Sequence, residues 1–161
     1  MAKQKKTSER DKPKKLAEAL LLRADLIKKI EHLQNRIRPV LIVSDDKQPQ
    51  EDPARLMAQL RQAINDLEAL VIQINTTNNT TAVEGYGNLM QALARRDALK
   101  MLSEKLRTIR YAAQINNSGE KELKTTIDIK KLQAEMDQTG RAFRTLDSTI
   151  QEINWSTVIK D

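Results

Sequence analysis

Four polar segments of the sequence carry the residue types that proteins use to hold anionic small molecules. Two of them, Arg23 and residues 95–97, interrupt repeats of apolar residues that are otherwise continuous. A charged side chain in an apolar seam is costly unless it is paired or meets a ligand. The other two are the Asn- and Thr-rich run 75–80 and the pair 154–155, which contains the only tryptophan. Guanidinium groups, amides, hydroxyls and an indole ring together predict a ligand site.

The candidate ligand-binding residues are Arg23, Asp25, Asn75, Asn78, Arg96, Asp97, Asn154 and Trp155. A plainer interpretation stays open beside this one. In it the arginines pair with the aspartates, the Asn/Thr run caps a helix, and Trp155 closes the end of the core.

Helices must position these residues, because apolar residues recur at alternating spacings of three and four. The repeats predict helices over about 14–38, 53–76 and 88–114, and a fourth helix that follows Asp128. Leu99, Leu102, Leu106 and Ile109 belong to the predicted seam of the third.

The expected helix boundaries follow from capping residues. Asp52, followed by Pro53, and Asp128 are predicted N-caps. The Asn- and Thr-rich stretch 75–88 is expected to end the second helix, since its side chains compete for backbone hydrogen bonds. Residues 122–127 are a candidate extended segment.

Four helices joined by three loops predict an all-α fold, either a four-helix bundle or paired helical hairpins with coiled-coil-like seams. One domain is expected over residues 14–161, preceded by a basic, disordered tail over 1–13. Antiparallel neighbours would bring the four polar segments to one end of the bundle.

Composition excludes several classes of chemistry. The 161 residues include no cysteine and one histidine, His32, which argues against thiolate or histidine metal sites. Residues 85–87 begin like a dinucleotide fingerprint, but Met90 stands where the third glycine belongs. We therefore expect no enzyme activity and no cofactor.

The net charge of +6 is concentrated at the N-terminus, where residues 1–15 hold seven basic and two acidic side chains. The rest is nearly neutral and poor in aromatic residues, so nucleic acid is not the expected main partner. No apolar run is long enough for a membrane span or a signal peptide, and a cytosolic protein is expected.

Two features of the predicted helices concern packing. Met57, Ile64 and Val71 form a second apolar stripe on the second helix, which predicts a homo-oligomer, either a dimer or a hexamer. Gly140, inside the fourth helix, indicates either a close helix contact or a tolerated cost.

Four segments of the chain, Leu16–Leu26, Ile74–Asn78, Ala92–Leu99 and Leu146–Trp155, have counterparts in a known family. In this order they resemble the septicolysin-like family of small helical proteins from bacteria and their phages. The resemblance spans about residues 16–157 and implies an oligomeric, all-helical, cytosolic protein that carries the eight candidate residues as its signature. It also favours the hexamer, and the family name implies a cytolysin.

The function expected from these observations is that of a non-enzymatic homo-oligomer that binds an anionic, nucleotide-like small molecule. Sequestration of a signalling nucleotide would be one use of such binding. Two alternatives stay open, a membrane-active, cytolysin-like protein and a structural coiled-coil scaffold.

Overall fold

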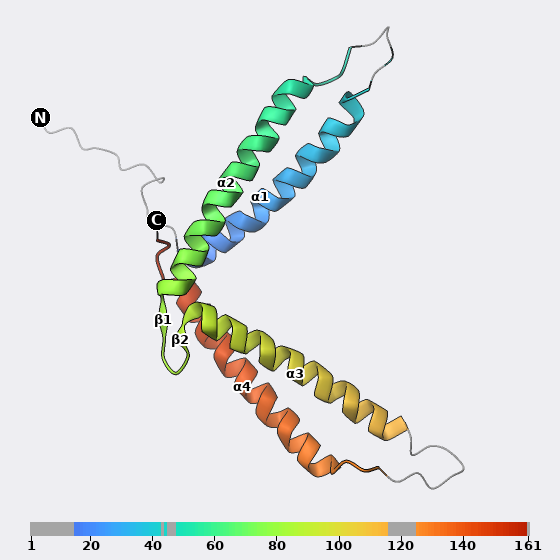
Figure 1. The fold of residues 1–161 in the computed structure, drawn as a ribbon, viewed down its shortest axis with the longest axis vertical. Helices are drawn as coiled ribbons and strands as arrows, with labels where there is room; N and C mark the ends of the chain where they lie inside the picture. The colour runs from blue at the N-terminus through green and yellow to red at the C-terminus, as the bar shows by residue number, and fades with distance from the viewer. Residues whose placement is uncertain (1–14, 43, 45–47, 116–124, 161) are drawn as a thin grey trace, which may run out of the picture. The chain divides into compact units, whose positions relative to one another are not determined.

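The protein is built from four long helices, as seen in a computed structural model that describes residues 15–42, 44, 48–115 and 125–160. The elements are α1 (Leu16–Ile37), the 3-10 turn η2 (Arg38–Val40), α2 (Pro53–Thr80), β1 (Ala82–Val83), β2 (Gly87–Asn88), α3 (Leu89–Ile115) and α4 (Ile129–Ser156) (Figure 1). The all-α prediction is therefore confirmed. The basic segment 1–13 and residues 122–124 lie outside the described residues, and residues 125–127 form no strand.

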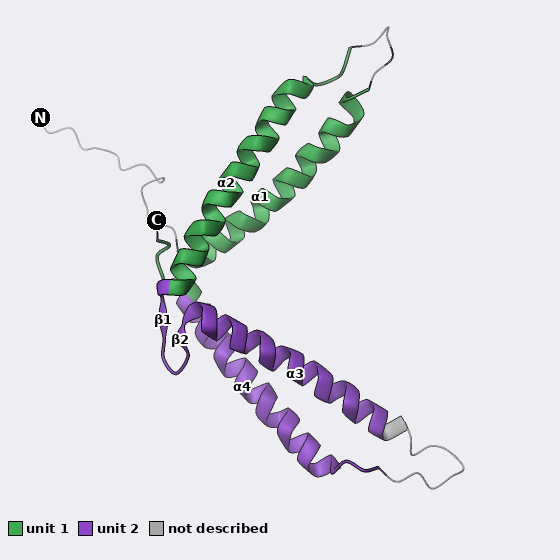
Figure 2. Ribbon diagram, in the orientation of Figure 1, with its two compact units in different colours: residues 1–79, 154–161 green, residues 80–153 purple. Residues whose placement is uncertain are grey.

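The chain divides into two compact units, coloured separately in Figure 2. The first unit comprises residues 1–79 and 154–161 and contains the α1–α2 hairpin. The second comprises residues 80–153 and contains the α3–α4 hairpin, with the two short strands ahead of it. Each unit is therefore built around one helical hairpin.

The core of the first unit lies between α1 and α2. One buried cluster there consists of Leu33, Ile37, Val40, Leu56 and Ala63, with Ile30, Met57 and Leu60 packed against it. The α1 members follow the three- and four-residue spacing of the sequence, so they lie on one face of the helix. Burial of that face against α2 holds the hairpin together.

The core of the second unit is formed in the same way by α3 and α4. Its buried helix residues are Leu89, Ala92, Leu99, Leu106, Leu132, Thr139, Leu146 and Ile150. The predicted seam of α3 is wrong at two positions, because Leu102 and Ile109 are exposed. Ser103 and Arg110 take the half-buried positions instead.

Both predicted aspartate caps are confirmed. Asp52 Oδ1 accepts a hydrogen bond of 2.9 Å from the Ala54 N–H. Asp128 Oδ1 accepts bonds of 2.9 and 3.1 Å from the N–H groups of Lys130 and Lys131. These contacts satisfy N–H groups that have no partner within the first helical turn.

The prediction that α2 ends near residue 76 is wrong, because the helix continues through Thr80. The Thr77 hydroxyl donates a 2.7 Å hydrogen bond to the Gln73 carbonyl, four residues earlier. This bond is compatible with helical backbone, and Thr77 is fully buried. Tertiary packing therefore overrides the low helix preference of the run.

A small β-hairpin, which the sequence analysis does not anticipate, connects α2 to α3. Val83 pairs with Gly87 and Ala82 with Asn88 in antiparallel register. The Tyr86 N–H donates to the Val83 carbonyl at 3.0 Å, closing a turn in which Gly85 has a φ of 75°. A positive φ at this turn position is easily adopted only by glycine, so Gly85 has a turn role here.

An ion pair near the start of α2 makes stability depend on pH. Arg36 Nε donates a 3.0 Å bond to Glu51 Oε2, and Arg36 Nη2 donates to Oε1. The hydrogen bond from Arg36 lowers the pKa of Glu51. A carboxylate with a lowered folded pKa contributes stability above its unfolded pKa and loses it as the pH falls through the folded pKa.

We therefore expect Glu51→Gln to unfold at a lower urea concentration than the wild type at neutral pH. The difference between the two unfolding midpoints should shrink as the pH is lowered through the range in which carboxylates titrate. Urea unfolding over a pH series measures this. Glu31→Gln, a change at an exposed glutamate of α1 that forms no ion pair with any described residue, is the matched control. A difference between Glu51→Gln and the wild type that does not change with pH would contradict the expectation.

Candidate functional site

The eight residues predicted to bind a ligand fall in both units. Arg23, Asp25, Asn75, Asn78, Asn154 and Trp155 belong to the first, and Arg96 and Asp97 to the second.

In the first unit the start of α1, the end of α2 and the end of α4 meet. Lys15 Nζ donates to the Ser156 carbonyl at 2.8 Å, and the Leu16 N–H donates to the Thr157 carbonyl at 2.9 Å. The Lys160 N–H donates to Thr77 Oγ1 at 2.9 Å. Of the four polar segments, the run 75–80 thus contacts the chain end that follows Asn154 and Trp155, whereas none of these hydrogen bonds involves Arg23. These hydrogen bonds fasten the C-terminal segment to the hairpin.

Several predicted residues of this unit are open to solvent. Trp155 is 59% exposed, so the interpretation that it closes the end of the core is wrong. Asn75 is exposed, whereas Asn78 and Asn154 are half-buried.

The prediction that Arg23 occupies an apolar seam is also wrong. Arg23 and Asp25 are both exposed, while Ala19 and Leu26 on either side are buried. Within the described part of the chain neither charged residue makes an ion pair. An arginine can cover apolar surface with its stem and keep its charge in water, so this position carries no desolvation cost.

In the second unit Arg96 is held by carboxylates. Its Nε and Nη2 lie 3.0 and 2.7 Å from Asp97 Oδ1, and its Nη1 lies 3.8 Å from Asp147 Oδ1. Two negative charges therefore offset the guanidinium. This arrangement matches the plainer interpretation of Arg96 and Asp97 as an ion pair, and it leaves Arg96 poorly placed to attract an anion.

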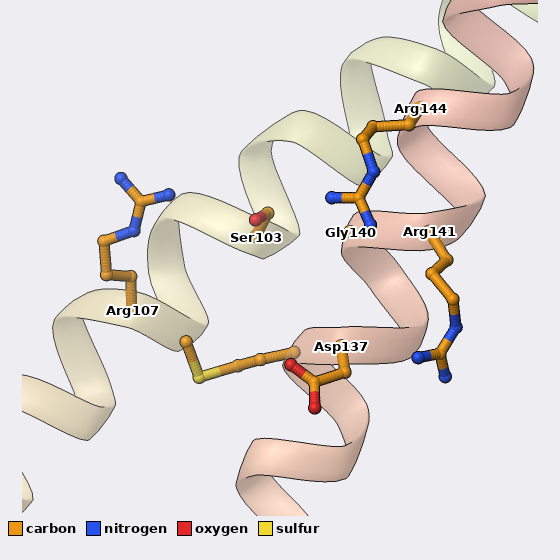
Figure 3. Close-up of a pocket in the computed structure, with 7 residues that line it drawn as sticks. Ser103, Arg107, Asp137, Gly140, Arg141 and Arg144 are labelled. Carbon is orange, nitrogen blue, oxygen red and sulfur yellow. The ribbon is translucent and has the colours of Figure 1, made fainter.

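A different cluster of arginines surrounds a cavity of about 320 Å³ between α3 and α4 (Figure 3). We call this the arginine groove; its lining residues are Ser103, Arg107, Met136, Asp137, Gly140, Arg141 and Arg144. It holds three arginines and one aspartate. In the residues that the structure describes, none of these three arginines forms an ion pair.

The side chains of the groove come from facing helices. Ser103 and Arg107 belong to α3, and Arg144 of α4 folds back over Gly140, whereas Arg141 points away from α3 (Figure 3). A Cβ on Gly140 would lie 3.4 Å from Arg144 Nη1. Asp137 Oδ1 accepts a 2.8 Å bond from Gln133 Nε2, which engages part of its carboxylate.

None of the eight residues predicted to bind a ligand lines the arginine groove. The signal was present in α4, where Arg141 and Arg144 lie three residues apart and share a face beside Gly140. The sequence does not show that Arg107 of α3 lines the same cavity.

Two other cavities, of about 420 and 530 Å³, lie near the α1–α2 connection. Both are lined by Arg36 and Glu51, whose charges offset each other.

Over the described ranges, no group of histidine, cysteine or carboxylate residues could hold a metal ion. No helix in the same ranges has both the length and the apolar character needed to cross a bilayer.

Gly140 does not mediate a close helix contact, since a Cβ there would meet only Arg144. Alanine in a helix interior is about 1 kcal/mol more favourable than glycine. We therefore expect Gly140→Ala to raise the free energy of unfolding by about 0.5–1 kcal/mol in urea titrations.

The matched variant is Gly85→Ala, the same change at a residue with a φ of 75°. Because alanine is strained in that conformation, this variant should lose stability. A loss at Gly140 would show that the glycine is required there.

The chain matches the model of one protein family and is similar to a solved structure. A crystal structure described as that of a functionally unknown conserved protein from Corynebacterium diphtheriae is similar, with a TM-score of 0.81 and 26% identity. The match covers 91% of this chain and 99% of the other. No curated protein matches the sequence. The model of a family of unknown function, DUF6847, matches residues 23–159, and the chain therefore belongs to this family.

Proposed function

We propose that the protein binds an anionic, phosphate-bearing small molecule in the arginine groove, as a binding protein and not as an enzyme. The observation that carries this proposal is the gathering of Arg107, Arg141 and Arg144 around one cavity without ion-pair partners among the described residues. Like charges that line one cavity repel each other, and an anion bound between Arg107 and Arg144 relieves part of that repulsion.

Phosphate is the anion that this chemistry fits best. A guanidinium presents a planar fork of N–H donors that matches two phosphate oxygens. The Ser103 hydroxyl adds a donor from α3. Arg141 points away from α3 (Figure 3), so Arg107 and Arg144 are the principal ligands in this proposal and Arg141 contributes positive potential.

A nucleotide is the proposed class of ligand because the groove offers more than charge. Guanidinium planes stack on aromatic rings such as nucleobases. Met136 supplies an adaptable apolar contact. A cavity of about 320 Å³ is near the lower end of the range of small-molecule sites, about 300–1,000 Å³, and favours a mononucleotide over larger ligands.

The test is calorimetric titration of the full chain with inorganic pyrophosphate and with linear and cyclic mononucleotides. The double variant Arg107→Gln/Arg144→Gln should bind at least tenfold more weakly, since two charge-assisted contacts are lost. Arg95→Gln, at an exposed α3 arginine outside the groove, is the control and should bind like the wild type.

Absence of binding at micromolar concentrations to every probe would contradict the proposal. Arg96→Ala separates the groove from the site predicted by the sequence. If this variant loses binding while the groove variant keeps it, the ligand lies at the polar segments instead.

A further inference from the structure

The second apolar stripe of α2 is only partly exposed, because Met57 and Val71 are half-buried and Met57 packs against the core cluster of the first unit. Met57, Ile64 and Val71 are each seven residues apart and so share a face. Ile64 is 47% exposed, and Ile72 at the edge of the same face is 59% exposed. The core residues of α2 are displaced from this stripe around the helix, because Leu56, Ala63 and Leu70 each precede a stripe residue by one position.

Two charged residues of opposite sign, Arg61 and Glu68, lie on this same face, also seven residues apart. Neither has an oppositely charged side chain three or four residues away on α2. Both are exposed, and neither forms an ion pair with any residue that the structure describes. The stripe is thus apolar apart from one positive and one negative side chain.

This pattern is complementary to itself in one orientation. If a two-fold axis passes between Ile64 and Asn65, two copies of α2 run antiparallel. Each residue on one side of the axis then faces the residue of the second copy that lies the same number of positions on the other side. Arg61 then faces Glu68 of the second copy, twice in the interface, and Met57 faces Ile72. Parallel packing in register would instead set Arg61 against Arg61 and Glu68 against Glu68, which is unfavourable.

We infer that a second copy of this chain docks on the stripe, forming an antiparallel, two-fold symmetric α2–α2 interface. The stripe from Met57 to Ile72 is about 22 Å long at ~1.5 Å per residue. The stripe is complementary to a second copy of itself, as the surfaces in an isologous contact between identical subunits are. The inference does not rest on ligand binding in the arginine groove, which lies on other helices.

Charge reversal tests this interface directly, with molar mass measured by light scattering behind a sizing column at micromolar concentration. The wild type should have twice the chain mass of 18.4 kDa. Arg61→Glu and Glu68→Arg should each dissociate at least tenfold more readily, since both symmetric pairs then become repulsive. Mixing these two variants should restore the dimer, because every pair is again of opposite sign.

Asp66→Lys is the matched control, since this reversal lies on the other side of α2 and should leave the dimer intact. Circular dichroism confirms that each variant is folded. A monomeric wild type would overturn the inference. So would single reversals that keep the wild-type mass, or a mixture that stays monomeric.

Discussion

Leu146→Ala is expected to lower the free energy of unfolding of the α3–α4 unit by about 2–5 kcal/mol. The Leu146 side chain is 1% exposed and lies among the buried residues of that unit. Alanine removes the apolar contacts of the side chain and leaves a cavity that close-packed neighbours fill only in part.

Urea unfolding followed by circular dichroism measures this loss. Leu102→Ala is the control, because Leu102 has the same side chain but is exposed on α3. Its loss should be clearly smaller, since Leu102 is 40% exposed and therefore has less buried apolar area to lose. Equal losses for the two variants would contradict the assignment of Leu146, and not Leu102, to the core.

Thr77→Val is expected to cost about 1–3 kcal/mol and to release the C-terminal segment. Valine has nearly the same shape as threonine but cannot accept the hydrogen bond from the Lys160 N–H, which is 2.9 Å long in the wild type. It also loses the 2.7 Å bond to the Gln73 carbonyl at a fully buried position. A polar group left without a partner in the folded protein costs its desolvation free energy.

Amide hydrogen exchange of Lys160 reports this release, and urea unfolding reports the stability. The control is Thr108→Val, because the Thr108 hydroxyl makes the same bond to a carbonyl four residues earlier but is exposed. Its effect should stay within about 0.5 kcal/mol. Unchanged exchange at Lys160 in Thr77→Val would contradict the role of Thr77 as the anchor of this segment.

The functional proposal keeps the class of ligand expected from the sequence and changes its location. Arg96 is a predicted ligand-binding residue because it interrupts an apolar repeat. In the structure, however, Asp97 and Asp147 offset its charge. The groove arginines have no such partners among the described residues. The septicolysin-like resemblance, with the cytolysin activity that its name implies, stays a prediction.

The sequence alone determined the all-α fold and where the helices begin. Asp52 and Asp128 could be recognised as caps because N-capping is a contact between residues two or three positions apart. Apolar spacing of three and four likewise depends only on the geometry of a single helix. Such local information is contained in a short window of sequence.

Tertiary structure decided what depends on a partner distant in the chain. Leu99 is followed by both Leu102 and Ser103 at spacings that suit a helical seam, and only the position of α4 left Leu102 exposed. The extension of α2 through Thr80 accompanies the contact between Thr77 and Lys160, 83 residues later. The arginine groove arises in the same way, because Arg107 and Arg144 line one cavity only when α3 and α4 pack side by side.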